Sequence, residues 1–317
     1  MIEFKQLEIP PQCARDRTHH YCDYIELLVL NSDIDGLSTA DIYDRFLEDE
    51  RIPAIGSVEG AGSIDAWSSE IDSWFAELKS REHAYGTYYP FTFHDNRVVL
   101  KRELTDYQLV YLGLLLCSSL RYIVDRSKLS SIFEFLSKCA MRQYLPNIAE
   151  VHIFGVSSKG EVDYKGSLED KVRQLAKDMK YEVTSNKKAF RRHDNGDGGV
   201  DIIAWVPFED DINLDKKLIF VGQSAATMDW FPKQHSGRRL KSFLDIEHEI
   251  ILSFYVPFDM RDASREFQDW SSITTDVMFD RYRLIRLLDP ATVFSGPLGE
   301  QFKAIIHDAI QFEEDIV

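Results

Sequence analysis

The segment of residues 197–201, Asp-Gly-Gly-Val-Asp, constrains the fold of this chain more than any other feature of its sequence. Its two adjacent glycines permit backbone conformations that other residues rarely adopt and allow another group to approach closely. The apolar, β-branched stretch Val200–Val206 follows and predicts a buried strand. Asp201 therefore stands at the mouth of a strand, where an acidic side chain is available for chemistry.

Two elements around this strand complete the pattern. The apolar run Leu218–Gln223 predicts a second strand, and the acidic turn at 209–215 makes the two strands a hairpin. If they pair as neighbours, Gln223 lies beside Asp201. Before them, apolar residues at helical spacing predict the helix Ser167–Met179, which carries Glu169 in its first turn.

The remaining pattern divides the chain near residue 150. We expect residues 1–150 to form a mainly helical domain that serves as a packing unit or partner platform, and residues 151–317 to form a mixed α/β domain. In the first, Ser38 and Asp41 predict a capping box. Its expected elements are the helices Thr39–Glu48, Ile64–Ser80, Thr105–Val124 and Leu129–Tyr144, and a hairpin or loop at Tyr85–Leu100. The second adds the strands Val151–Gly155, Tyr181–Thr184 and Glu249–Phe258 and the helices Asp280–Leu288 and Gly299–Ile310.

Glu169, Asp201 and Gln223 together offer two carboxylates and an amide oxygen. Such hard oxygen donors are the ligands that Mg2+ prefers. A divalent cation held in this way can activate water and neutralise charge on a scissile phosphate. The three residues are therefore candidate metal ligands in an enzyme that cleaves phosphodiester bonds.

In this order, the Glu169 helix, the Asp-Gly-Gly-Val-Asp strand and the Gln223 strand resemble the Mrr-type branch of the PD-(D/E)XK nucleases, over residues 166–225. The resemblance implies a restriction-endonuclease-like core, with a four-stranded mixed sheet flanked by helices. It also implies a Mg2+ site, in which Mn2+ can substitute, formed by Glu169, Asp201 and Gln223. The implied activity is endonucleolytic cleavage of DNA.

The sequence departs from the family pattern where a lysine should follow the glutamine by two residues, because Ala225 stands there. Lys233 completes our candidate catalytic set with Glu169, Asp201 and Gln223, because position in space decides the chemistry. Lys187 and Lys188, in the loop before Asp201, compete with Lys233 for this role. Without such a replacement, the chain is a catalytically degenerate DNA-binding or scaffolding subunit of a larger defence complex.

Charge is distributed unevenly along the chain. The net charge of −16 argues against a surface that attracts nucleic acid everywhere, and it fits a third alternative, a regulatory protein unconnected with nucleic acid. Residues 165–192, however, contain nine basic residues against four acidic ones, and residues 233–241 contain four basic residues and no acid. We expect these two runs to contact DNA phosphates. The candidate contacts are Lys187, Lys188, Arg191, Arg192, Arg238 and Arg239.

The remaining expectations concern location and partners. No apolar run reaches the roughly 20 residues needed to cross a bilayer, and no secretory signal is recognisable, so we expect a cytoplasmic protein. The four cysteines are sparse, and we expect no disulfide. DNA is the expected partner. The alternatives are a protein partner on the N-terminal domain and a homo-oligomer. The expected setting is bacterial anti-phage defence or restriction.

Overall fold

A computed structural model describes residues 2–11, 18–31, 36–52, 60–155, 163–186, 189–190, 198–208 and 216–312, with the backbone alone for 60–64. The chain forms two compact units. The first comprises Met1–Arg126, Phe258–Trp270 and Glu300–Val317, and the second Ser127–Pro257 and Ser271–Gly299. The first break between the units falls after Arg126, and two later segments belong to the first unit, so the units are not consecutive stretches of the chain.

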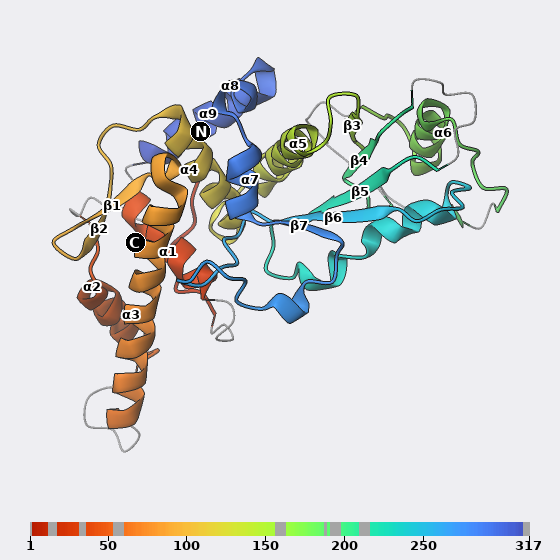
Figure 1. Cartoon of the computed structure of the whole chain (residues 1–317). Helices are drawn as coiled ribbons and strands as arrows, with labels where there is room; N and C mark the ends of the chain where they lie inside the picture. The colour runs from red at the N-terminus through yellow and green to blue at the C-terminus, as the bar shows by residue number, and fades with distance from the viewer. Residues whose placement is uncertain are drawn as a thin grey trace. The chain divides into compact units, whose positions relative to one another are not determined.

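The first unit is mainly helical, as the N-terminal sequence pattern predicts (Figure 1). The predicted capping box is present, with Ser38 and Asp41 joined reciprocally at the start of a helix. The segment around residues 85–100 contains an antiparallel hairpin. The elements of this part of the chain are α1 (His19–Leu30), α2 (Thr39–Glu48), α3 (Gly60–Tyr85), η2 (Gly86–Tyr88), β1 (Phe91–His94), β2 (Arg97–Leu100), α4 (Asp106–Ser118) and η3 (Leu120–Tyr122).

A buried ion network lies in the core of the first unit. The fully buried guanidinium of Arg81, on α3, lies 2.8 Å from Asp23 and 3.2 Å from Glu26, both on α1. It also lies 3.2 Å from Glu77, one turn earlier on α3, and 3.3 Å from Asp259, in the returning segment. The network therefore joins three segments that are far apart in the sequence.

The second unit contains a five-stranded mixed sheet in the order β3-β4-β5-β6-β7 (Figure 1). The β3–β4 and β4–β5 pairs are antiparallel, and the β5–β6 and β6–β7 pairs are parallel. The strands are β3 (Glu150–Ile153), β4 (Ile202–Trp205), β5 (Ile219–Ser224), β6 (Ile251–Tyr255) and β7 (Val277–Phe279). The helices are α5 (Arg126–Tyr144), α6 (Leu168–Met179), η5 (Phe231–Lys233), η6 (Ser236–Ser242), η7 (Trp270–Ser272), α7 (Arg281–Leu287), α8 (Pro290–Val293) and α9 (Gly296–Ile310), of which α5, η7 and α9 cross the unit boundaries.

Helices cover both faces of this sheet. The apolar side of α6 packs into one buried cluster with Ile203, Val221 and Leu252. On the other face, Tyr255 stacks on Phe279, which in turn contacts Tyr144 at the end of α5. The layers are therefore α5, the sheet and α6. This mixed α/β architecture agrees with the coarse fold expected from the sequence.

Two expectations about the sheet need correction. Tyr181–Thr184 is not a strand of the sheet, because it makes only an isolated bridge between Val183 and Leu244. The edge position belongs to β3, and the described sheet has five strands instead of four. A polar stretch such as Tyr181–Thr184 offers few apolar side chains for a sheet buried on both faces. Among the described helices, none is long and apolar enough to span a membrane.

Candidate functional site

Asp201 and Gln223 lie side by side at one end of the sheet. Ile202 pairs with Gly222 across the β4–β5 hairpin, so Asp201 is opposite Gln223. The Gln223 amide nitrogen donates a hydrogen bond to Asp201 Oδ2, and the Ser224 backbone N–H donates a second at 2.7 Å. Asp201 is only 4% exposed. The predicted hairpin thus brings these two residues together and fixes one oxygen of the carboxylate.

The glycine turn before Asp201 is shaped by its backbone. Gly198 and Gly199 have φ angles of +62° and +86°, a region that disfavours residues with a side chain. A Cβ on Gly199 would lie 2.9 Å from the Cβ of Ser236, in η6. The two glycines therefore let η6 pack directly against the turn that leads into Asp201.

A second carboxylate reaches the same place from α5. A Cβ added to Gly155, two residues after β3, would lie 2.8 Å from Glu134 Oε2 and 3.5 Å from Asp201 Oδ1. Both carboxylates therefore face the backbone of Gly155. The absence of a side chain there is what allows Glu134 to approach. We call Glu134, Asp201 and Gln223 the sheet-end site.

Lys171 brings a positive charge to the sheet-end site from the other helix layer. Its Nζ donates to Gly155 O at 3.0 Å and to Phe154 O at 3.2 Å. The side chain is buried on the inner side of α6, with 5% of the residue exposed. Glu134 from α5 and Lys171 from α6 thus converge on Gly155, two residues after β3.

Glu169 does not join this group. It is two residues from Lys171, so the two side chains leave α6 on opposite sides. Its carboxylate is 47% exposed and accepts a hydrogen bond of 2.6 Å from Arg173, one turn further along the helix. The structure therefore offers Glu134 in place of the helix glutamate expected from the sequence.

One feature of the sequence could have indicated Glu134, although the family motif points to Glu169 instead. Glu134 is the only acidic residue of α5, and it lies between Phe133 and Phe135. A lone carboxylate among aromatic residues is unusual without a partner. Glu134 contacts Gly155 across the intervening strand β3, and the spacing of residues along the sequence does not predict this contact.

The lysines expected near Asp201 lie elsewhere or outside the described residues. Lys233 Nζ lies 3.4 Å from Thr227 Oγ1, its nearest hydrogen-bond partner in the described part of the chain. Ala225 is buried, with its backbone N–H bonded to Tyr255 O at 2.9 Å. Four further candidates fall outside the described residues, namely Lys187, Lys188, Arg191 and Arg192.

Basic side chains of η6 lie close to the glycine turn. Arg238 is exposed, and Arg239 lies over the Phe243 ring, with its guanidinium carbon 5.2 Å from the ring centroid. A Cβ on Gly198 would lie 2.8 Å from the same Phe243 ring. The second basic run of the sequence therefore flanks the turn that carries Asp201.

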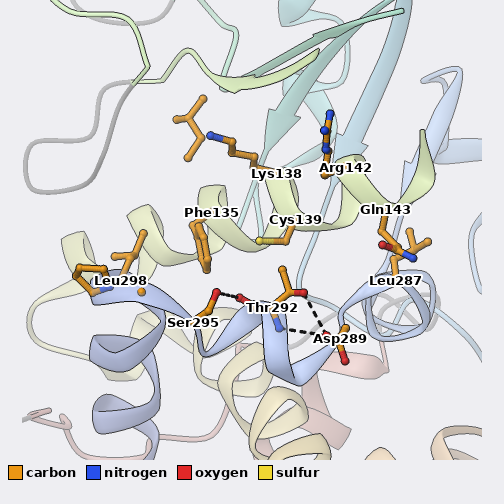
Figure 2. A pocket seen from close by; sticks show the side chains of 13 residues that line it. Phe135, Lys138, Cys139, Arg142, Gln143, Leu287, Asp289, Thr292, Ser295 and Leu298 are labelled. Carbon is orange, nitrogen blue, oxygen red and sulfur yellow. Dashed lines mark hydrogen bonds between the residues drawn. The ribbon is translucent and has the colours of Figure 1, made fainter. Parts of the chain in front are cut away.

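A separate cavity of about 240 Å³ lies between α5 and the turn that joins α8 to α9 (Figure 2). Its hydroxyl groups are satisfied internally, since Ser295 donates to Thr292 O at 2.7 Å and Thr292 to Asp289 at 3.1 Å. Burial raises the pKa of the Cys139 thiol in its wall to about 11, so the thiol is neutral near pH 7. None of the three sheet-end side chains lines this cavity.

The donors at the sheet-end site fit a hard cation better than zinc. Two carboxylates match Mg2+, whereas zinc prefers Cys and His. Gln223, expected as a third ligand, instead presents its amide nitrogen to Asp201. Within the described residues, no group of three or more His, Cys, Asp or Glu side chains could hold a metal ion. Mg2+, however, is commonly held by one or two carboxylates with water and substrate phosphates. Searches for related proteins gave no match to a family model, a curated protein or a solved structure.

Proposed function

We propose that this protein is a Mg2+-dependent endonuclease that hydrolyses DNA phosphodiester bonds at the sheet-end site. The observation that carries this proposal is the convergence of Glu134 and Asp201 on Gly155, with Gln223 beside Asp201. A bound Mg2+ would supply Lewis acidity and an activated water. On this hypothesis the two carboxylates hold the cation, and Gln223 orients Asp201.

The arrangement of the sheet supports the finer fold assignment within the same proposal. An antiparallel β3–β4–β5 meander, extended by parallel β6 and covered by α5 and α6, is compatible with a restriction-endonuclease-like core. In such a core, α5 would be the helix that precedes the first strand and Glu134 its acidic residue. η6 would then present Arg238 beside the path of the DNA backbone.

The competing function is a DNA-binding or scaffolding subunit without catalysis, which Ala225 favours because a lysine is missing there. A single assay separates the two functions. Purified protein is incubated with supercoiled plasmid and Mg2+ or Mn2+, beside Asp201→Asn and the matched control Glu169→Gln.

We expect the wild type and Glu169→Gln to nick or linearise the plasmid at similar rates. Asp201→Asn should lose at least about 100-fold in rate, since it removes a charge that holds the cation. Full activity in Asp201→Asn would exclude the sheet-end site. DNA binding without cleavage by the wild type under all these conditions would favour the competing function.

A further inference from the structure

Lys171 is a buried lysine whose ammonium lies beside Gly155, next to the two carboxylates of the sheet-end site. Lysine is almost never fully buried unless it is paired. Its two backbone acceptors, Phe154 O and Gly155 O, belong to the chain segment between the carboxylates of the sheet-end site. The N–H groups of Phe154 and Gly155 in turn donate to Asp201 O, at 2.7 and 3.1 Å. The ammonium is thus linked through this segment to the backbone carbonyl of Asp201, the residue whose carboxylate belongs to the site.

The second unit contains another buried lysine that serves for comparison. Lys217 is 4% exposed, and its Nζ donates to Met179 O at 2.8 Å, at the C-terminal end of α6. Lys217 precedes β5, whereas the sheet-end site lies where β5 ends. The two lysines therefore share burial and backbone acceptors, and Lys171 alone belongs to the end of the sheet that carries the site.

We propose that Lys171 is the charge-balancing residue of the sheet-end site. Its ammonium offsets the mutual repulsion of Glu134 and Asp201 and the repulsion that both exert on an incoming phosphodiester. Like charges in one site destabilise each other, and a fixed positive group stabilises negative charge that develops in a transition state. The part of this proposal that concerns the phosphodiester rests on the proposed nuclease function.

If Lys171 has this role, removing its charge should strengthen metal binding and slow catalysis. A fixed ammonium repels a divalent cation, so removing it should tighten metal binding. A unit charge roughly 6 Å from a divalent ion changes affinity by about tenfold even at the dielectric of water. Cleavage should slow by about 100-fold, because one electrostatic stabiliser is lost. A residue that only supports packing would weaken both together.

The test compares Lys171→Met with Lys217→Met, in the full-length protein. Lys171→Gln is a second variant, since it keeps an N–H donor for Gly155 O without the charge. Three quantities are measured: the free energy of unfolding in urea, the Mn2+ affinity by calorimetry, and the single-turnover rate of DNA cleavage. We expect tighter Mn2+ binding and slower cleavage in both Lys171 variants, and wild-type values of these two quantities in Lys217→Met.

Weaker or unchanged Mn2+ binding in Lys171→Gln would overturn the proposal, as would equally tightened Mn2+ binding in Lys217→Met. If the wild type binds Mn2+ and does not cleave DNA, the nuclease function fails, and the Mn2+ affinities still decide whether Lys171 balances the carboxylates. If the wild type binds no Mn2+, both proposals are overturned.

Discussion

Gly155 is where the two carboxylates of the sheet-end site meet, and its missing side chain has a testable consequence. In Gly155→Ala the new methyl group would stand 2.8 Å from Glu134 Oε2, the end of a flexible side chain that can move aside. We therefore expect little loss of stability and a fall of at least about tenfold in Mn2+ affinity, because Glu134 leaves its position beside Asp201. Calorimetry with Mn2+ and urea denaturation measure the two effects.

Gly222→Ala is the matched control for this prediction. Its Cβ would lie 2.9 Å from the ring of Tyr255 and 3.1 Å from Ile202 and Ser253, within the packed sheet, so that none of its three nearest atoms belongs to a carboxylate. This variant should lose stability and keep its Mn2+ affinity once folded. If Gly155→Ala binds Mn2+ as the wild type does, Glu134 is not a ligand.

At the residue level, the sequence predicted the hairpin that places Gln223 beside Asp201. The two residues are opposite each other because β4 and β5 pair as neighbours, with Ile202 opposite Gly222. Glu134 was not predicted, because the family pattern places the glutamate on the helix before the Asp201 strand, and Glu169 occupies that position. Which side of a helix faces a strand end depends on packing between distant elements, and spacing alone does not determine it.

The short helix η6 presents the basic run that we expect to contact DNA. Replacing Arg238 and Arg239 by Glu should weaken DNA binding at low salt. It should also reduce the slope of log affinity against log salt concentration by about one for each phosphate contact that is lost. The control replaces Arg102 and Arg286 by Glu, because both are exposed outside the basic run and the net charge changes by the same amount. Fluorescence anisotropy at several salt concentrations measures both. Equal loss in the control would mean that only the total charge matters.

At the level of elements, strong periodicity predicted most of the helices and the β4–β5 hairpin. The capping box at Ser38 fixed the start of α2 at the residue expected. The prediction at Tyr181–Thr184 was wrong because β propensity in a short segment depends on having a partner strand. There the Thr184 backbone N–H donates to Phe243 O, and Glu182 O accepts a hydrogen bond from the Asp245 N–H.

Across the whole molecule, the ion network around Arg81 makes stability depend on pH. Burial raises the pKa of Glu77 from 4.5 to about 7, with Arg81 opposing the shift and Asp259 adding to it. A raised pKa means that the folded protein keeps a proton that the unfolded chain has released. The contribution of Glu77 to stability is therefore complete below pH 4.5 and is lost as pH rises through 7.

Glu77→Gln isolates this effect, because the amide stays neutral at every pH. Between pH 4.5 and 8 its free energy of unfolding should rise relative to the wild type by about 3 kcal/mol. Burial also lowers the pKa of His19 to about 4, which acts in the opposite direction but is common to both proteins and cancels in the difference. Urea denaturation across this pH range makes the comparison. A difference independent of pH would contradict the account.

The division of the chain into units was the feature least accessible from the sequence. A linear pattern predicted two consecutive domains, whereas Phe258–Trp270 and Glu300–Val317 belong to the first unit. The returning segment contributes Asp259 to the Arg81 network, and nothing in its local sequence marks a partner more than 170 residues away. Buried ion pairs between such segments depend on the tertiary fold, so the local sequence does not predict them.

We propose that Glu134 and Asp201 together hold a divalent cation. The most direct measurement is an anomalous difference map from a crystal of the wild-type protein soaked in Mn2+. We predict a peak beside Gly155, between the carboxylates of Glu134 and Asp201, that disappears in Glu134→Gln and remains in Glu169→Gln. A peak at Glu169, or no peak at the sheet-end site in a protein that cleaves DNA with Mn2+, would contradict the account.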